Sequence, residues 1–474
     1  MIDKRSFYIN GAWVSPATAR DFDVVNPSNE EPCAIISLGD ESDTNAAVVA
    51  AKSALPGWSG TDVRDRIALV ERIQSEYEKR SDEMAKAISL EMGAPIDMAT
   101  AQQVGAGRHH IGDFLRAAKD FKFERSLGND KIIYEAAGVC ALITPWNWPM
   151  NQVTLKVIPA LLAGCTTVLK PSEIAPLSSL LFAEFVHDSG APAGVFNLVN
   201  GDGSGVGTQL CRHPDVDLIS FTGSTRAGRL IMANAAETLK RVYTEMGGKG
   251  ANLVFADADE KAVERGVVHC FNNSGQSCNA PTRMLVERSM YDNAVATAQS
   301  VAEDVTIGLA KDSGGHIGPV VSDVQYDKIQ KLIQKGIDEG ARLVTGGPGL
   351  PGNMASGYFV KPTVFADVSN SMTIAREEIF GPVLSIIPFD SEEEAIAIAN
   401  DTPYGLTNYI QTSDTNRRER LCRKLRSGMV EINGQGGGSG RPFGGMKGSG
   451  NAREGGMWGL EEYLEVKAVS GLST

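Results

Sequence analysis

Close cysteine pairs are missing from the sequence. Its seven cysteines are odd in number and widely spaced, and no Cys-x-x-Cys pair occurs among the 474 residues. Neither a zinc ribbon nor a disulfide framework is therefore indicated. Because scattered thiols are typical of reducing compartments, we expect reduced cysteines and a cytoplasmic protein.

Long apolar runs and a surplus of basic residues are missing as well. The longest apolar stretch, 157–169, contains Pro159 and Gly164 and is too short to cross a bilayer. Residues 1–10 carry charges but no apolar core, so we expect no secretory signal. The formal net charge is -13, whereas nucleic-acid binders usually present a basic face. We therefore expect neither a membrane nor a nucleic acid as partner.

Several catalytic signatures are also absent. The six histidines form no His-Glu-x-x-His motif, and no serine lies in a Gly-x-Ser-x-Gly elbow. Metal catalysis and a serine triad are therefore not indicated, and we expect no metal ion. The strict Gly-x-Gly-x-x-Gly fingerprint is missing too. The run 201–207, which includes Gly203 and Gly207, is a weak cofactor signal and is equally typical of an ordinary loop.

What the sequence does contain is an alternation of helical and strand-like segments. Apolar residues within 67–77 recur at three- and four-residue steps, and a second helix is predicted from Ser81 to Gly93. Beyond residue 138, short apolar runs alternate with helical stretches. These runs are 138–143, 166–169, 195–199, 218–221 and 252–255. The pattern predicts an α/β fold with parallel strands, and a second α/β pattern covers about 248–440.

Polar residues and turn formers directly follow three of these runs, at 144–147, 170–173 and 222–224. Ligands of doubly wound sheets bind beyond the carboxyl ends of the strands, so we expect the site there. The stretches 119–134 and 463–468 alternate like exposed strands. Their pairing into an arm that reaches another subunit is a prediction from pattern alone.

Three residues could carry covalent chemistry. Cys278 has small polar neighbours, which suits a nucleophile, although an inert buried thiol is the commoner case. Glu245 precedes a Gly-Gly pair and is either a base that activates water or a surface carboxylate. Asn147 lies between two tryptophans and two prolines and is either an oxyanion donor or a turn former.

Taken together, these segments resemble the aldehyde dehydrogenase superfamily over nearly the whole chain, from about residue 9 to 467. Seven motifs occur in the family's order. They are Pro145-Trp146-Asn147, Lys170-Pro171-Ser172-Glu173, Phe221-Thr222-Gly223-Ser224, Glu245-Met246-Gly247-Gly248-Lys249, Gly275-Gln276-Ser277-Cys278, Glu377-Glu378-Ile379-Phe380-Gly381-Pro382 and Pro442-Phe443-Gly444-Gly445.

The resemblance implies a role for each candidate. Cys278 would attack the aldehyde, and Asn147 with the Cys278 backbone N–H would hold the oxyanion. After hydride transfer to a nicotinamide, a thioester would remain, which water activated by Glu245 would hydrolyse. Lys156 would tune Glu245 through a proton path.

The resemblance also implies substrate and cofactor contacts. Trp148 and Phe443 match positions that flank the aldehyde, which favours an apolar or aromatic substrate. Lys170 and Glu173 would hold the adenosine ribose, and Glu173 would repel a 2′-phosphate, so NAD is favoured while NADP stays possible. The further expected cofactor contacts are Thr144, Trp146, Gly203, Gly207, Phe221, Ser224, Met246, Glu378 and Phe380.

The family's architecture has three parts. We expect a Rossmann-like parallel-sheet NAD-binding domain at 1–117 and 140–247, an α/β catalytic domain at 248–459, and a small β oligomerisation arm at 118–139 and 460–474. This architecture implies a homodimer or homotetramer.

Three alternatives stay open. The first is an acylating, CoA-dependent relative, against which the presence of Glu245 argues. The second is a thiol hydrolase, and the third is a non-enzymatic protein on the same fold. The glycine-rich loop 434–440 leaves the aldehyde itself open.

Overall fold

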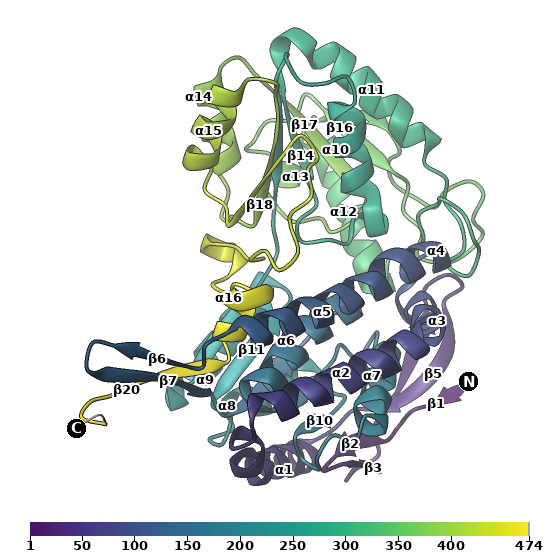
Figure 1. The fold of residues 1–474 in the computed structure, drawn as a ribbon. Helices are drawn as coiled ribbons and strands as arrows, with labels where there is room; N and C mark the ends of the chain where they lie inside the picture. The colour runs from purple at the N-terminus through teal and green to yellow at the C-terminus, as the bar shows by residue number, and fades with distance from the viewer. Residues whose placement is uncertain (473–474) are drawn as a thin grey trace.

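The computed structural model describes residues 1–472 and consists of two stacked α/β halves with a strand arm (Figure 1). Each half is built on a seven-stranded sheet. The two α/β patterns predicted from the sequence correspond to these two halves. The predicted arm's last two residues, 473–474, lie outside the described residues. No helix among residues 1–472 is both long and apolar enough to cross a membrane.

The sheet of the lower half has the order β12-β11-β8-β9-β10-β2-β3. Its strands are β12 (Arg241–Glu245), β11 (Leu218–Thr222), β8 (Val139–Ile143), β9 (Thr166–Lys170), β10 (Phe196–Leu198), β2 (Phe7–Ile9) and β3 (Ala12–Val14). The five strands from β12 to β10 are parallel, which confirms the predicted runs in this half. Every residue of β8, β9 and β11 is buried, because helices cover both faces of the sheet.

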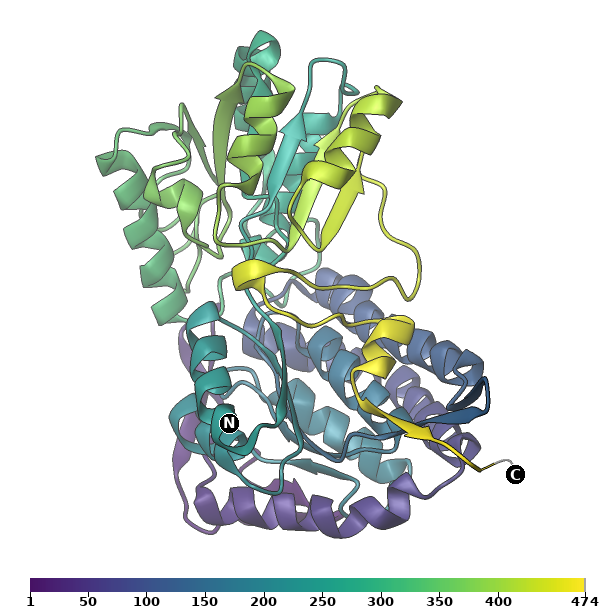
Figure 2. The ribbon, with the colours of Figure 1, turned by 90° about the vertical axis from the view of Figure 1, so that its left-hand side faces the viewer.

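The helices of this half form two layers around the sheet. Helix α1 runs along the bottom of the molecule in Figure 2, and its residues pack with β8 and β11 in one core. A larger core on the other face joins most of the remaining helices. The helices are α1 (Glu41–Ser59), α2 (Val63–Lys79), α3 (Ser81–Met92), α4 (Ile96–Met98), α5 (Gly105–Asp120), α6 (Pro149–Ala163), α7 (Leu177–Asp188), α8 (Thr208–Arg212) and α9 (Thr225–Ala235).

The predicted helix pair is confirmed, but short elements were missed. Helix α3 begins at Ser81 and ends at Met92, and the predicted stop Gly93 follows it as a left-handed cap with φ 82°. Sequence periodicity did not reveal the small sheet β1-β5-β4 or two π-helical turns. Those elements are β1 (Ile2–Asp3), β5 (Glu31–Ser37), β4 (Asp21–Asn26), η1 (Ala99–Val104) and η2 (Gly203–Gly207).

The upper half carries the second sheet, with the order β15-β16-β17-β14-β13-β18-β19. Its strands are β15 (Arg342–Thr345), β16 (Thr363–Ala366), β17 (Val383–Phe389), β14 (Arg283–Glu287), β13 (Ala251–Val254), β18 (Thr407–Gln411) and β19 (Met429–Ile432). Its helices are α10 (Ala262–Phe271), α11 (Tyr291–Asp304), α12 (Asp323–Asp338), α13 (Thr373–Arg376), α14 (Glu392–Asn400) and α15 (Thr415–Lys424).

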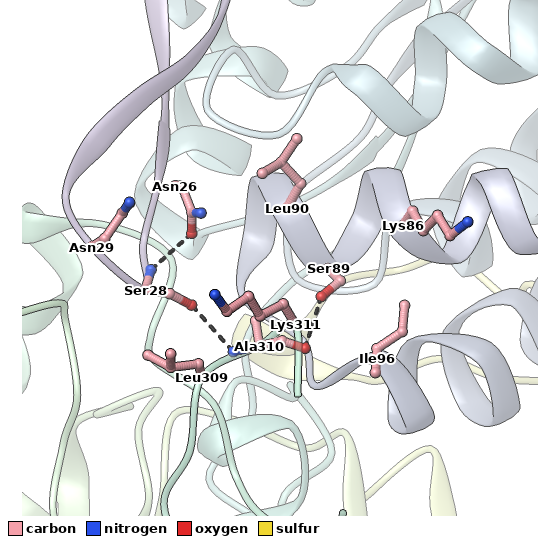
Figure 3. Close-up of a pocket in the computed structure, with 10 residues that line it drawn as sticks. All are labelled: Asn26, Ser28, Asn29, Lys86, Ser89, Leu90, Ile96, Leu309, Ala310 and Lys311. Atoms are coloured by element: carbon pink, nitrogen blue, oxygen red, sulfur yellow. Dashed lines mark hydrogen bonds between the residues drawn. The ribbon is translucent and has the colours of Figure 1, made fainter. Parts of the chain in front are cut away.

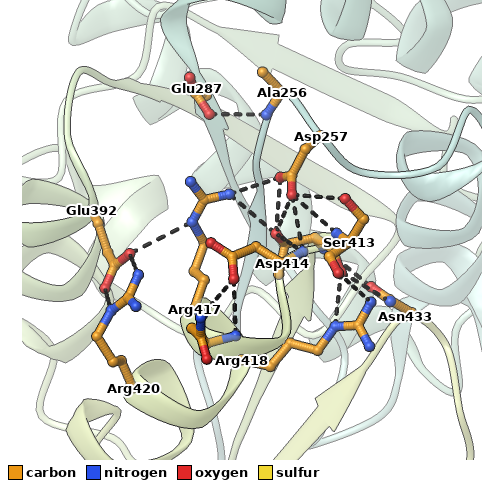
Figure 4. Close-up of polar contacts among 12 residues, drawn as sticks. Ala256, Asp257, Glu287, Glu392, Ser413, Asp414, Arg417, Arg418, Arg420 and Asn433 are labelled. Carbon is orange, nitrogen blue, oxygen red and sulfur yellow. Dashed lines mark hydrogen bonds and ion pairs between the residues drawn. The ribbon is translucent and has the colours of Figure 1, made fainter.

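One carboxylate ties the ends of β13 and β18 together. Asp257 accepts hydrogen bonds from the hydroxyl of Thr412 at 2.8 Å and from the backbone N–H of Ser413 at 3.1 Å (Figure 4). It also pairs with the guanidinium of Arg417 at 2.7 Å. This cluster fixes the start of α15 against the sheet.

The two halves meet along a hydrogen-bonded seam. In the pocket of Figure 3, the hydroxyl of Ser89 donates to the carbonyl of Ala310 at 3.0 Å, and the N–H of Ala310 donates to Ser28 at 3.2 Å. After β19 the chain returns to the lower half, where α16 (Gly456–Glu461) packs on α5 and α6.

The arm is a three-stranded sheet with the order β20-β7-β6. The pairing of the two predicted strand regions is confirmed, since β20 (Leu464–Val469) lies antiparallel to β7 (Asp130–Ala136). The prediction of one strand over 119–134 is wrong. Residues 119–120 still belong to α5, and β6 (Glu124–Leu127) forms a hairpin with β7. A hairpin and a strand share the same alternation, and Gly128 at φ 59° permits the turn.

Candidate active site

A cavity of about 190 Å³ lies where the strand ends of the lower half meet the upper half. It brings together seven of the predicted residues. These are Trp146, Asn147, Ser224, Met246, Cys278, Glu378 and Phe380. Its other lining residues are Pro145, Gln152, Thr222, Gly223, Gly247, Gln325 and Lys328. The cavity therefore sits at the edge of the sheet that the sequence indicates.

Cys278 is half-buried and follows α10 and the short turn η4 (Asn272–Gly275). Two residues of this turn, Asn273 and Ser274, have φ values of 53° and 56°, a region that non-glycine residues rarely adopt. Such backbone strain concentrates at functional sites. Gly248 lies against the loop, because a Cβ there would stand 2.3 Å from the carbonyl oxygen of Cys278.

Asn147 is held by a network of amides. Its Nδ2 donates to the carbonyl of Gln276 at 2.9 Å, which ties it to the cysteine loop. The backbone carbonyl of Asn147 accepts hydrogen bonds from Nε2 of Gln103 at 3.0 Å and from Nδ2 of Asn273 at 2.9 Å. Gln103 is fully buried and comes from the π-helical turn η1. Such turns often occur at functional sites, but no sequence signal marks this one.

Glu245 ends β12 and is 2% exposed, yet neither of its carboxylate oxygens has a hydrogen-bond partner. Burial and the neighbouring Glu454 raise the pKa of Glu245 well above its ordinary value, while Lys156 opposes this rise. Lys156 is buried, donates to the hydroxyl of Ser220 at 3.1 Å and forms an ion pair with Glu454. The predicted neighbours Glu245 and Lys156 thus share a buried charge cluster with Glu454.

Burial raises the pKa of the Cys278 thiol above its ordinary range, and the carboxylates of Glu245 and Glu378 raise it further. The three groups therefore share one electrostatic environment, which disfavours negative charge. The thiolate of Cys278 is correspondingly a strong base when it forms.

Glu378 lies at the rim of the cavity and accepts from the N–H of Gly248 at 2.9 Å. A Cβ at Gly247 would stand 2.2 Å from Oε2 of this carboxylate, so only glycine allows the approach. Trp146 and Phe380 pack edge to face with ring centroids 5.4 Å apart. Phe380 has φ 61° and is, after Asn273 and Ser274, a third strained residue at the site.

The other predicted cofactor residues lie around the same strand ends but outside the lining of this cavity. Lys170 and Glu173 form an ion pair at 3.1 Å directly after β9. The N–H of Thr144 donates to the carbonyl of Lys170 at 3.1 Å, which joins two strand ends. Ser224, which does line the cavity, caps α9 by accepting from the N–H of Ala227 at 3.2 Å.

Three further predicted residues also stand outside the lining. Phe221 is buried in β11, and Gly203 and Gly207 bound the π-helical turn η2. Among residues 1–472 no cluster of metal-ligating side chains occurs.

The two predicted substrate residues flank the catalytic candidates. The indole N–H of Trp148 donates to the hydroxyl of Ser277 at 2.8 Å, next to Cys278. Phe443 pairs with Glu454 through backbone hydrogen bonds of 2.7 Å. Its neighbour Gly444 lies against Glu245, because a Cβ there would stand 2.7 Å from Oε1.

A comparison with known protein families decides to which family the chain belongs. A sequence model of the protein family described as "Aldehyde dehydrogenase family" matches residues 13–469. The chain belongs to the aldehyde dehydrogenase family. The predicted family, α/β fold and enzyme class, an oxidoreductase acting on aldehydes, are therefore confirmed.

Individual aldehyde dehydrogenases resemble the chain over almost its full length. A 3-succinoylsemialdehyde-pyridine dehydrogenase of Pseudomonas sp is 51% identical over 99% of both chains. A crystal structure of an aldehyde dehydrogenase from Bartonella henselae has a TM-score of 0.99 at 60% identity, covering 99% of this chain and 100% of that one. A variant from Pseudomonas syringae, solved with NAD⁺ and octanal, has a TM-score of 0.98 at 47% identity and covers 99% and 97%.

Sequence reasoning missed two polar groups of this aldehyde dehydrogenase. Glu454 was not singled out, because an isolated glutamate carries no motif and its partner Lys156 is 298 residues away. Gln103 was missed because its contact with Asn147 depends on the π-helical turn. Both groups touch predicted site residues directly.

Proposed function

We propose that this aldehyde dehydrogenase converts an aldehyde to a carboxylic acid, with NAD⁺ as oxidant and a thioester on Cys278 as intermediate. The observation that carries the proposal is a single cavity lined by the thiol of Cys278, the amide of Asn147 and the predicted cofactor residues Glu378 and Phe380. Glu245, an unpartnered buried carboxylate close enough to influence the thiol, supplies the second half of the chemistry.

The first step is attack by the Cys278 thiolate on the aldehyde carbon. A C–S bond forms and the carbonyl electron pair moves onto oxygen. Nδ2 of Asn147 carries two N–H bonds and gives one to Gln276, so the other is available to the oxyanion together with the backbone N–H of Cys278. Each such donor lowers the barrier by about 3 to 4 kcal/mol.

The tetrahedral carbon becomes a thioester when it loses hydride, and NAD⁺ supplies, when bound, the acceptor for that hydride. The residues present fit such a cofactor. Glu378 stands as a ribose acceptor against Gly247, and Trp146 and Phe380 form an aromatic wall. Ser224 stands at the start of α9, where backbone N–H groups favour a phosphate.

Hydrolysis of the thioester completes the reaction. Water attacks the acyl carbon while Glu245 takes its proton, the C–S bond breaks, and the Cys278 thiolate leaves as the acid forms. Because burial raises the pKa of Glu245, its carboxylate is a stronger base than an exposed one. Lys156 acts through Glu454 and Glu245 as a positioning residue for the proton.

NAD⁺ is the proposed cofactor in preference to NADP⁺. Glu173, paired with Lys170 after β9, would repel a 2′-phosphate. The relative from Pseudomonas syringae and an aldehyde dehydrogenase from Bacillus cereus were both solved with NAD⁺, which supports the choice. Initial rates with each cofactor test it, and equal kcat/KM values would contradict it.

The proposed substrate is an aldehyde with an apolar or aromatic portion next to the carbonyl. Trp148 supports this class by its contact with Ser277, and Phe443 by its pairing with Glu454 next to Gly444, which lies against Glu245. Octanal bound to the Pseudomonas syringae relative and the name of the Pseudomonas sp relative are consistent with it. A panel of aliphatic, aromatic and charged aldehydes, followed by absorbance of the reduced cofactor, tests the class.

Product analysis separates this function from its alternatives. Free acid is expected from aldehyde and NAD⁺, and Cys278→Ala is expected to form none. Acyl-CoA formed in the presence of CoA would instead support the acylating reaction. Unchanged turnover in Cys278→Ala would contradict the covalent mechanism.

The assembly, domain boundaries and location stay proposals. We propose a homodimer or homotetramer built through the arm, which exposes 67% of Leu127 and 63% of Val466. Light scattering tests the subunit number. Limited proteolysis tests the boundaries of the NAD-binding domain, catalytic domain and arm, and cell fractionation tests the predicted cytoplasmic location.

A further inference from the structure

The cavity that contains Cys278 also holds an amide that the proposed reaction does not use. Gln152 of α6 lines this cavity and is only 4% exposed. Its Oε1 is enclosed by protein and has no hydrogen-bond partner. Its Nε2 has no partner among residues 1–472 either, but this atom is not enclosed and borders the cavity. Because buried polar groups are nearly always paired, the free N–H₂ indicates a partner that enters the cavity.

The other buried polar side chains of α6 do have partners. The hydroxyl of Thr154 donates to the carbonyl of Met150 at 2.7 Å, and Nζ of Lys156 donates to the hydroxyl of Ser220 at 3.1 Å. The rest of the buried surface of the helix is apolar apart from Gln152. Among the described residues, Gln152 is therefore the buried polar side chain of α6 that packing alone does not explain.

The packing of α6 on the sheet places Gln152 over the end of β11. Helix α6 joins the parallel strands β8 and β9, so it runs against their direction. Lys156 contacts Ser220 of β11. Gln152 lies one helical turn before Lys156, and Thr222 lies two strand residues after Ser220, which are steps of roughly 6 and 7 Å in the same direction. Gln152 therefore lies over Thr222, and both residues line the cavity.

Thr222 connects this position to the predicted base. It pairs in register with Glu245 of the neighbouring strand β12. Side chains paired in register point to the same face of a sheet, and the two strands lie only about 4.8 Å apart. The amide of Gln152 therefore lies close to the carboxylate of Glu245, in the cavity that also holds the thiol of Cys278. A free donor and an unpartnered carboxylate thus meet beside the nucleophile.

We propose that Nε2 of Gln152 donates a hydrogen bond to the water that attacks the thioester on Cys278, and so orients this water between the acyl carbon and Glu245. This inference rests on the proposed function, in which Glu245 is the base. The water oxygen forms the new C–O bond with one lone pair and accepts from Gln152 with the other. Its proton passes to Glu245, the C–S bond breaks, and the thiolate of Cys278 leaves.

Gln152→Met separates the two halves of the reaction, because water takes part only in the second. Methionine is unbranched and flexible, so it fills the place of the glutamine without its amide. Stopped-flow absorbance of the reduced cofactor gives the rate of the first turnover, which is expected to stay at the wild-type value. Release of the acid is expected to fall roughly 10- to 100-fold, because a misplaced reactant slows a reaction to this extent. Acyl-Cys278 should then accumulate, visible as added mass on the intact protein.

Hydroxylamine gives a readout that a purely structural fault would not change. It is a stronger nucleophile than water and attacks a thioester without help from a base. Hydroxylamine is therefore expected to restore turnover of Gln152→Met, with a hydroxamic acid as the product in place of the free acid. Gln334→Met, which changes an exposed glutamine on α12, is the matched control and should alter neither the first turnover nor the release of acid.

Gln152→Asn provides a second variant in case Gln152→Met does not fold. It keeps an amide but withdraws it by one methylene, so a smaller, equally selective fall in acid release is expected. A slower first turnover, or a raised KM for aldehyde or NAD⁺, would mean that Gln152 acts on the substrate or the cofactor and would overturn the proposal. An unchanged rate of acid release would overturn it as well. Failure of the wild-type protein to form free acid from aldehyde and NAD⁺ would instead count against the proposed function.

Discussion

The approach of Gly247 to Glu378 makes the predicted cofactor site quantitatively testable. In Gly247→Ala the new Cβ would stand 2.2 Å from Oε2 of Glu378 and 2.6 Å from its Cδ. Ordinary contacts of a Cβ begin at 3.4 Å, so the carboxylate must retreat by about 1.2 Å, the difference between 3.4 and 2.2. A movement of this size breaks the 2.9 Å hydrogen bond from the N–H of Gly248.

The expected loss follows from the kind of bond that is broken. A hydrogen bond to a charged group contributes roughly 1.5 to 3 kcal/mol. If Glu378 holds the nicotinamide ribose, NAD⁺ affinity in Gly247→Ala should fall by about 10- to 150-fold, since 1.4 kcal/mol corresponds to a factor of ten. Fluorescence titration with NAD⁺ measures this affinity, and KM for NAD⁺ at saturating aldehyde gives an independent value.

Two controls separate cofactor binding from general damage. Gly105→Ala, in α5, meets no atom within 4 Å and should leave NAD⁺ affinity unchanged. Hydrolysis of an activated ester without cofactor requires only Cys278 and its surroundings, so Gly247→Ala should retain it. NAD⁺ affinity within twofold of wild type, or an equal loss of ester hydrolysis, would refute the assignment of Glu378 to the cofactor.

Four further outcomes are expected. Glu245→Gln should give one burst of reduced cofactor and then stop with acyl-Cys278, visible as added mass on the intact protein; steady turnover would contradict its role as base. Gln103→Met should lower kcat by up to about 100-fold with little change in KM, because it frees the carbonyl of Asn147 and loosens an oxyanion donor. Burial raises the pKa of Glu91 from its ordinary 4.5 to about 7, so this carboxyl contributes stability below pH 4.5 that is lost as pH rises towards 7. Denaturant titrations should show this decline in the wild-type protein but a smaller one in Glu91→Gln. Asp257→Ala should lower the free energy of unfolding by about 1 to 3 kcal/mol in the same assay, because it leaves the cluster of Thr412 and Arg417 without its acceptor.

The elements that could be predicted from the sequence are those whose burial is complete or regular. Strands β8, β9 and β11 are buried on both faces, so each reads as an unbroken apolar run. Helix α2 shows its period because one face packs in the core while the other meets solvent. By contrast, β1 has two residues and both are exposed, so no pattern could reveal it.

The candidate site divides in the same way. Cys278, Asn147 and Glu245 stand in local motifs and could be singled out within a few residues of sequence. Glu454 reaches the site only through the return of the chain to the lower half after β19, and Gln103 only through a π-helical turn. Their roles depend on tertiary contacts, which short-range sequence patterns do not encode.

The glycines of the motifs explain why local sequence could locate a site formed from both halves. Gly247 lies against Glu378, Gly248 against the carbonyl of Cys278, and Gly444 against Oε1 of Glu245. Each contact joins segments far apart in the chain at a distance that a Cβ would prevent. The glycines therefore mark the places where strand ends and loops approach most closely, and each lies next to a different predicted functional group. Substitution of any of these glycines therefore changes the distance between two functional groups, and it leaves the chemical nature of each group as it is.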